Sequence, residues 1–240
     1  MKKREDAMYG RSAHLYDTRY AAKDYAAESA QLHAVIQQSC PGAASLLDVA
    51  CGTGKHLARL QAYYRVAGVD LSQDMLAVAR KRNPDVPLHQ GDLVDFALGQ
   101  RCDAVMCLGS SIGFTKTVEK LNQAVANMAR HLRPGGVLVI YSWILPEAWR
   151  PGTIHADFVD EPNLKIAHMN VSETLDRVSV MDFHFLVGTP EGVEHFVDRH
   201  ELGLFAHEEY VAACLQAGLS MVQAPQWSED RRLYVGVLGE

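Results

Sequence analysis

The sequence lacks an apolar run long enough to cross a membrane. Its longest, residues 137–145, includes a tyrosine and a serine and falls well short of the ~20 residues of a spanning helix. No apolar segment follows the charged start MKKREDAMYGRSAHLYD, so no secretory signal is visible. We therefore expect a cytoplasmic protein with no membrane partner.

Basic residues are also fewer than acidic ones. The 240 residues include 23 Lys and Arg against 29 Asp and Glu, a formal net charge of −6. Broad binding of nucleic acid needs a cationic face, because phosphate contacts supply most of its binding energy. The composition argues against a nucleic-acid partner and leaves room for a local basic patch that holds a few phosphates.

Cysteine is infrequent, and its spacing does not suggest pairing. The five cysteines, at positions 40, 51, 102, 107 and 214, are an odd number without the spacing of a zinc site. Cys102 and Cys107 fall in or beside a predicted strand. We expect reduced, buried thiols of the kind found in the cytosol, and no bound metal.

The sequence does contain an alternation of short apolar strands and amphipathic helices. The predicted strands are 46–50, 66–70, 88–90, 104–108 and 137–142, and the predicted helices are 55–63, 74–81 and 118–132. This alternation indicates a parallel sheet covered by helices on both faces. Residues 1–40 read as helical, up to Pro41-Gly42, and are expected to form a cap over the active site.

The pattern changes after Pro146. Residues 165–171, 178–187 and 193–205 are strand-like and have no helix between them, which indicates an antiparallel meander. A helix over 207–217 and strands near 219–222 and 233–238 follow. We predict an α/β fold in one domain, residues 1–240. Its sheet is Rossmann-like and parallel with an antiparallel C-terminal edge, and an antiparallel β insertion at 150–206 contributes to a substrate site or a dimer interface.

The stretch SLLDVACGTGKHLARL, residues 45–60, places a glycine turn between the first strand and the next helix. Gly52 and Gly54 let a ligand approach the backbone at the carboxyl edge of the sheet, where open α/β folds bind ligands. Asp70 ends the next strand at the same edge, and a carboxylate there can accept both hydroxyls of a ribose. The turn and Asp70 alone fit a dinucleotide, another adenosine compound, or a turn without a ligand.

Two details favour an adenosine compound other than a dinucleotide. A dinucleotide site needs a third small residue where the helix meets the strand, and Leu57 occupies that place. Asp92 falls in a turn after the third strand, where its side chain can accept a hydrogen bond from an exocyclic amine.

Four motifs in order then resemble the class I S-adenosylmethionine-dependent methyltransferases: DVACGTG (48–54), Asp70, Gly91-Asp92 and LRPGGVLVI (132–140). The resemblance implies S-adenosyl-L-methionine as cofactor, S-adenosyl-L-homocysteine as product, and no metal. The residues that it implies around the cofactor are Asp70 on the ribose diol, Asp92 and the Leu93 amide on adenine, Leu71 and Met75 on the adenine faces, the Ala50 to Gly52 backbone along the methionine, and Cys107 near the sulfonium.

A closer resemblance covers nearly the whole chain. KDYAAES (23–29), LSQDML (71–76), SSIG (110–113), FHFLV (183–187) and RRLYVGV (231–237) resemble bacterial N-methyltransferases of TDP-linked amino sugars. Those enzymes complete dimethylamino groups such as those of desosamine and mycaminose. The resemblance implies a TDP-amino sugar substrate, methylated at its amine in natural-product biosynthesis, and suggests a homodimer.

The same resemblance implies roles for residues outside the cofactor motifs. Tyr9 would cover the sugar, Tyr16 and Tyr25 would hold the amino-acid end of the cofactor, and Ser111 would face the transferred methyl. Arg231 would bind the pyrophosphate, which also has a physical reason, because a planar guanidinium suits phosphate oxygens.

Two departures from the family pattern concern the acceptor. Phe114 stands where some members carry histidine, and Trp143 lies in a segment that differs from the family's; both are expected to border the sugar. A 3-amino and a 4-amino hexose remain equally plausible, as do one and two methyl transfers. No general base is assigned: Tyr9 or a water could relay the proton, and His184 and His200 are read as structural.

Two other functions stay open at this point. One is an O- or N-methyltransferase of an unactivated natural product, for which the insertion would form an apolar pocket. The other is a cofactor-binding scaffold without catalysis.

Overall fold

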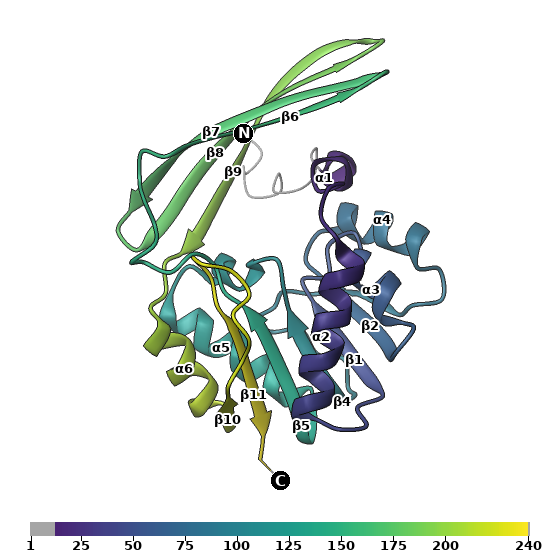
Figure 1. Cartoon of the computed structure of the whole chain (residues 1–240), viewed down its shortest axis with the longest axis vertical. Coiled ribbons are helices and arrows are strands. Elements are labelled where there is room, and N and C mark those ends of the chain that lie inside the picture. The colour runs from purple at the N-terminus through teal and green to yellow at the C-terminus, as the bar shows by residue number, and fades with distance from the viewer. Residues whose placement is uncertain (1–12, 240) are drawn as a thin grey trace.

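The computed structural model describes residues 13–239 (Figure 1). Its first part contains α1 (Ala13–Arg19), α2 (Tyr25–Ser39), β1 (Ser45–Val49), α3 (Lys55–Leu60), β2 (Arg65–Asp70), α4 (Gln73–Arg82), β3 (Leu88–Gln90), β4 (Cys102–Cys107), the 3-10 helix η2 (Ser111–Thr115), α5 (Val118–Arg130) and β5 (Leu132–Tyr141). Strands β6 (Ile154–Glu161), β7 (Leu164–Leu175), β8 (Val178–Thr189) and β9 (Gly192–Gly203) follow, and α6 (His207–Gln216), β10 (Leu219–Val222) and β11 (Leu233–Leu238) come last. None of the described helices has the length and apolar character needed to cross a membrane.

The central sheet has seven strands in the order β10-β11-β5-β4-β1-β2-β3. Strands β1 to β5 are parallel, and β11 runs antiparallel between β5 and β10. Val137, Val139 and Ile140 on β5 are fully buried, as expected where helices cover both faces of a parallel sheet. The predicted parallel sheet with an antiparallel C-terminal edge is therefore confirmed. Because β1 pairs with both β2 and β4, the chain reverses its winding direction there, and ligands bind at the carboxyl edge beside such a point.

Strands β6 to β9 form a second, antiparallel sheet, which we call the inserted sheet. In Figure 1 it lies across the top of the α/β body. The sequence predicted only three of its strands, and β6 is the one that was missed. The segment IHADFVDE mixes charged and apolar residues, and almost all of its side chains are exposed, so propensity and periodicity carry little signal there.

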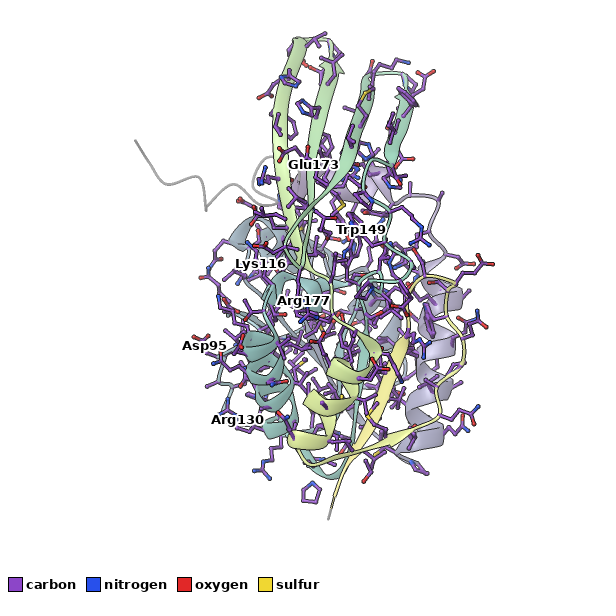
Figure 2. All side chains as sticks on the ribbon, turned by 90° about the vertical axis from the view of Figure 1, so that its left-hand side faces the viewer. Asp95, Lys116, Arg130, Trp149, Glu173 and Arg177 are labelled. Atoms are coloured by element: carbon purple, nitrogen blue, oxygen red, sulfur yellow. The ribbon has the colours of Figure 1, made fainter. Side chains whose placement is uncertain are left out.

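Two tryptophans fix the inserted sheet to the body. The indole N–H of Trp143 donates to Ser179 Oγ and that of Trp149 donates to Thr174 Oγ1, each at 2.8 Å. Figure 2 shows Trp149 at the level where the sheet meets the body, with Glu173 farther up the sheet. A buried indole must satisfy its N–H, so both hydrogen bonds favour one position of the sheet relative to the body.

Helix α1 contacts both parts of the molecule. Asp17 accepts a hydrogen bond from Thr53 Oγ1 at 2.7 Å and pairs with Arg82, which ties the helix to the glycine turn. Arg19 contacts His168 Nε2 on β7 at 2.7 Å, and its guanidinium lies over the Phe185 ring. Burial and then the charge of Arg19 lower the pKa of His168 to about 4, so the imidazole is neutral and accepts this hydrogen bond.

Candidate active site

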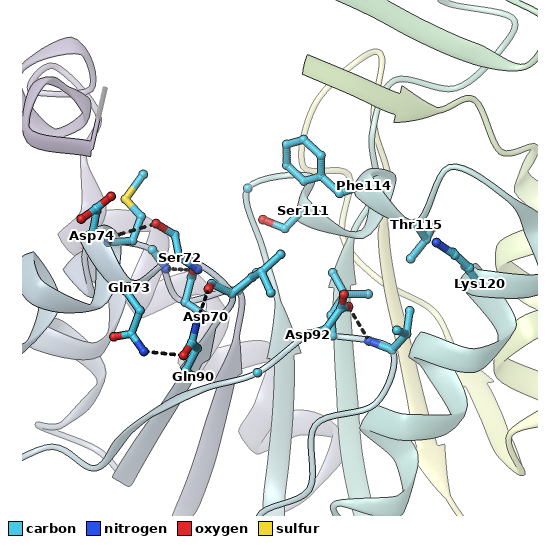
Figure 3. Close-up of a pocket in the computed structure, with 18 of the residues that line it drawn as sticks. Asp70, Ser72, Gln73, Asp74, Gln90, Asp92, Ser111, Phe114, Thr115 and Lys120 are labelled. Carbon is cyan, nitrogen blue, oxygen red and sulfur yellow. Dashed lines mark hydrogen bonds between the residues drawn. The ribbon is translucent and has the colours of Figure 1, made fainter. Parts of the chain in front are cut away.

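A cavity of about 710 Å³ lies at the carboxyl edge of the central sheet (Figure 3). The ends of β1, β2 and β3 form one wall, and η2 with the start of α5 forms the other. Most of the predicted site residues line it: Tyr16, Ala50, Gly52, Asp70, Leu71, Met75, Asp92, Leu93, Ser111 and Phe114.

The two glycines of the turn serve different purposes. Gly52 has a φ of 55°, and a Cβ built on it would meet no atom within 4 Å, so its bare backbone faces open space that a ligand can fill. Gly54 has a φ of 72°, and a Cβ there would lie 2.5 Å from Nδ2 of Asn83 on the neighbouring chain segment. Gly52 therefore serves ligand approach, and Gly54 serves packing against α4.

The Asp70 carboxylate is held by two backbone amides. The amide of Gly52 donates to Oδ2 at 2.7 Å, and the amide of Ser72 donates to Oδ1 at 2.8 Å. An ionised carboxylate accepts about four hydrogen bonds, so each oxygen keeps capacity for a hydroxyl of a ligand. The two bonds fix the orientation in which a ribose diol would meet it.

The electrostatics of this wall favour a cationic ligand. Burial raises the pKa of Asp70 against these two hydrogen bonds, and burial followed by the charge of Asp70 raises the pKa of Asp48 well above its usual range. Asp74 and Asp92 also line the cavity. A cation beside such carboxylates favours their ionised form, whereas a pyrophosphate would be repelled. The wall fits a sulfonium and an amino group better than a dinucleotide.

Side chains with apolar surface lie next to these carboxylates. Met75 is buried, whereas Leu71 is 57% exposed although it is a large apolar side chain at the edge of the cavity. Asp92 accepts a hydrogen bond from the Val94 amide at 3.1 Å, which fixes the turn after β3. An exposed leucine beside a fixed carboxylate provides both an apolar surface and a polar acceptor for a flat heterocycle.

Several cavity residues were not found from the sequence, among them Gln73, Gln90, Thr115, Lys116 and Lys120. The two lysines are placed by η2 and the helix that follows it, which begins after a left-handed residue at Lys116 (φ 61°). A 3-10 turn flanked by left-handed residues has no clear periodicity, so periodicity contained no signal for the two lysines, whereas Ser111 and Phe114 on the same wall were named from the family resemblance.

Four predicted residues of the described part are not among those that line the cavity: Tyr25, Cys107, Trp143 and Arg231. Cys107 is fully buried in β4, and burial raises the pKa of its thiol. Tyr25 packs edge-on against His56, and burial followed by Glu28 raises its pKa to about 12. The Arg231 guanidinium lies over the Trp143 ring, 5.0 Å from its centre. Tyr9 lies outside the described residues.

The inner face of the inserted sheet, which is turned toward α1 and η2, carries buried polar groups. Both amide atoms of Asn170 and the hydroxyl of Ser172 are buried and have no hydrogen-bond partner within residues 13–239. Each unsatisfied buried polar group costs about 1–3 kcal/mol. Such groups indicate a surface that a polar ligand or water completes, and no pattern in the sequence predicted them.

Comparison with known proteins identifies the family. A family model described as "Methyltransferase domain" matches residues 46–136. The chain is 44% identical to the dTDP-3-amino-3,4,6-trideoxy-alpha-D-glucopyranose N,N-dimethyltransferase of Streptomyces venezuelae, over 94% of this chain and 97% of that protein. The chain belongs to the sugar N-methyltransferases. It is therefore an S-adenosylmethionine-dependent enzyme that transfers methyl groups to nitrogen.

Other relatives and solved structures agree with this family. The dTDP-4-amino-2,3,4,6-tetradeoxy-D-glucose N,N-dimethyltransferase of Saccharopolyspora spinosa is 38% identical over 94% of this chain and 92% of its own length. Streptomyces venezuelae DesVI superposes with a TM-score of 0.89 at 43% identity, covering 95% and 98% of the two chains. CalS10, an amino pentose methyltransferase solved with S-adenosylmethionine bound, gives 0.84 at 38% identity, covering 93% and 95%. The class I methyltransferase fold expected from the motifs is thus confirmed.

Replacing Asp70 by Asn should weaken binding of S-adenosylhomocysteine about 100-fold in calorimetry. The variant loses charge-assisted hydrogen bonds to the ribose, worth about 3 kcal/mol together. Asp85→Asn, in an exposed position away from the cavity, is the matched control and should bind like the unaltered enzyme. Equal affinities of D70N and D85N would contradict a role for Asp70 in cofactor binding.

Proposed function

We propose that this enzyme transfers methyl groups to the amine of a TDP-linked amino deoxysugar, twice, to give a dimethylamino sugar in antibiotic or natural-product biosynthesis. The observation that supports this most strongly is the similarity to three named N,N-dimethyltransferases of dTDP-amino sugars, each over at least 94% of this chain. The matched region includes the inserted sheet. A methyltransferase that shared only the cofactor motifs with this chain would not need to match there.

The cavity residues fit S-adenosylmethionine in the following way. Asp70 accepts the ribose hydroxyls, Asp92 and the Leu93 amide bind adenine, and Leu71 and Met75 pack against its faces. The backbone of Ala50 to Gly52 follows the methionine part, and Tyr16 contacts its end. Open space at Gly52 and the acidic wall support this assignment. Tyr25 and Cys107 lie outside the cavity and support it by packing.

When bound, S-adenosylmethionine supplies an electrophilic methyl group on a positively charged sulfur. The chain's own contribution is alignment and exclusion of water, because most of the driving force resides in the cofactor. Ser111 and Phe114 line the cavity on the side opposite Asp70 and direct the acceptor amine, and Trp143 supports them from behind. No metal takes part in this scheme.

Arg231 is proposed to bind the pyrophosphate. Its Nε is buried and has no hydrogen-bond partner in the described part of the chain, and stacking on Trp143 holds the guanidinium in one plane. A buried guanidinium nitrogen without an acceptor is suited to an anionic ligand oxygen.

The enzyme should methylate a TDP-3-amino or a TDP-4-amino hexose when both are offered with S-adenosylmethionine. Mass spectrometry should show gains of one and then two methyl units, which identify acceptor and extent together. The matched control is the same amino sugar without its nucleotide, which should not react. Equal reaction of the free sugar would instead favour an enzyme that acts on unactivated natural products.

Replacing Arg231 by Ala should raise the KM for the TDP-amino sugar about 10- to 100-fold and leave the KM for S-adenosylmethionine unchanged, because one charge-assisted contact of roughly 1.5–3 kcal/mol is lost. Arg232→Ala, at the exposed neighbouring position, is the control. An unchanged sugar KM in R231A would refute the pyrophosphate role.

We also propose that two copies of the chain associate through the outer face of the inserted sheet. The strand register puts Phe158 (72% exposed), Met169, Leu186 and Val197 on this one face. Four charged residues on the same face form two ion pairs, Lys165 with Asp160 and Arg199 with Asp182. An apolar face with neutralised charges is complementary to itself, as an isologous dimer requires.

Phe158→Glu should convert the homodimer to a monomer in sedimentation experiments, because the interface would then bury one unpaired carboxylate from each copy. Leu215→Glu, another exposed apolar position but on α6, should leave the association unchanged. A monomeric unaltered enzyme at micromolar concentration would exclude this interface.

A cytoplasmic location also remains a proposal, supported by five cysteines that are all free thiols.

A further inference from the structure

Asp48 is a buried acid close to the wall that would hold the cofactor. It lies on β1, two residues before Ala50, which lines the cavity. Ala50 has a φ of 60°, a left-handed conformation that turns the chain sharply at the end of the strand. The Asp48 side chain is only 2% exposed and accepts no hydrogen bond from residues 13–239. Because a buried carboxylate without a hydrogen-bond donor is unstable, the neutral acid is favoured at this position.

The register of the central sheet places a second carboxylate on the same face. Asp48 is opposite Gly68 of β2 and opposite Met106 of β4, and neither residue has a side chain that can donate a hydrogen bond. Asp70 follows Gly68 by two residues and therefore points to the same face of the sheet. Two backbone amides donate to Asp70, whereas Asp48 has no such donor in the described chain. The two neighbouring acids thus differ in how well their ionised forms are stabilised.

Titratable groups from four neighbouring segments act on this buried carboxyl group. Burial and then the charge of Asp70 on β2 raise its pKa well above the usual range, and Lys23 before α2 lowers the pKa to a smaller extent. Among these described groups only Lys23 is a cation, and it also pairs with Glu28 at 2.8 Å. Cys51 after β1 and Cys107 on β4 are neutral thiols, because burial and then the same carboxyl group raise their pKa. Further positive charge in the cavity would therefore change the protonation of this acid.

We infer that Asp48 is protonated in the free enzyme and loses its proton when the methyl donor binds, so that it favours the donor over the product. The inference rests on the proposed course of the methionine part along the Ala50 to Gly52 backbone, and not on the identity of the acceptor. The donor has a positively charged sulfur there, whereas the sulfur of S-adenosylhomocysteine is neutral. The Asp48 O–H bond breaks with its electron pair staying on oxygen, and the proton passes to solvent. After methyl transfer the carboxylate takes a proton back from solvent, because the positive charge on sulfur has gone.

The direction of the pH dependence follows from this proton release. Below the pKa of Asp48 in the free enzyme, binding of the donor releases a proton, so affinity for the donor rises with pH. The rise ends above that pKa, which burial and Asp70 place above the usual carboxyl range. The product carries the same ribose and the same ammonium group, so the contribution of Asp70 to the ribose cancels in the ratio of the two affinities. This ratio therefore reports the charge of Asp48.

The test is calorimetry of S-adenosylmethionine and S-adenosylhomocysteine binding from about pH 5 to pH 8, in two buffers of different ionisation enthalpy. The unaltered enzyme should release more protons with the donor than with the product. Its preference for the donor should rise with pH, by at most about 10-fold per pH unit for one proton. Asp48→Asn should remove the difference in proton release and make the preference independent of pH. Asp85→Asn, at an exposed position away from the cavity, is the matched control and should behave like the unaltered enzyme.

A second measurement observes the proton itself. Infrared difference spectra of the unaltered enzyme should show the carbonyl band of a protonated carboxylic acid disappear when the donor binds, and persist when the product binds. The band should be absent from Asp48→Asn. Asparagine has the shape of the neutral acid, so this variant should unfold thermally at the same temperature as the cofactor-free enzyme or higher, which guards against a folding defect.

The outcomes decide between a role in donor preference and a structural role. Equal proton release with donor and product in the unaltered enzyme would overturn the inference. A difference that persists in D48N would assign the proton to another group and overturn it as well. An equal loss of affinity for both ligands in D48N, with the pH dependence of their ratio retained, would show that Asp48 only supports the turn. Because no acceptor is needed, none of these results depends on the proposed sugar substrate.

Discussion

The hydrogen bonds of the Asp70 carboxylate to the Gly52 and Ser72 amides are the constraint on which the site depends. They join the turn after β1 to the start of α4, so the two loops that form the cofactor wall move as one unit. Burial raises the pKa of Asp70, and the backbone N–H that each carboxylate oxygen accepts stabilises the ionised form at this position. The same oxygens remain available to a ligand, so the group that holds the turn together also faces the cavity.

Helix α1 extends this constraint to the acceptor side. Asp17 and Arg19 are two residues apart and carry opposite charges, and each contacts a different part of the molecule. Asp17 binds the glycine turn by its hydrogen bond with Thr53, and Arg19 binds the inserted sheet by its hydrogen bond with the neutral His168. This short helix, together with the Trp143 and Trp149 hydrogen bonds, therefore holds the inserted sheet at one distance from the wall that contains Asp70. Alignment of a methyl donor and an acceptor requires a fixed spacing of this kind.

The sequence predicted which residues at the ends of β1 and β2 line the cavity, because this wall depends on backbone conformation and on strand ends. Gly52 and Asp70 follow directly from a glycine turn and from the carboxyl end of the next strand, both of which are local features. The acceptor wall could not be predicted in the same way. Lys116 and Lys120 are placed by a 3-10 turn, and β6 has almost no buried face. The contact of His200 with Phe114 joins residues that are far apart in the sequence. Only tertiary structure brings such residues together, and a single sequence contains no signal for it.

The inserted sheet presents two different faces through the alternation of its side chains. Val197 and Arg199 point to the outer face, which carries exposed apolar residues and an ion pair of Arg199 with Asp182. Asp198 and His200, the residues between and after them, point to the inner face beside Phe114. Because successive side chains of a strand point to opposite faces, a shift of one residue in register would exchange the two sets. Register in β8 and β9 therefore decides which face carries the exposed apolar residues and which face packs beside Phe114.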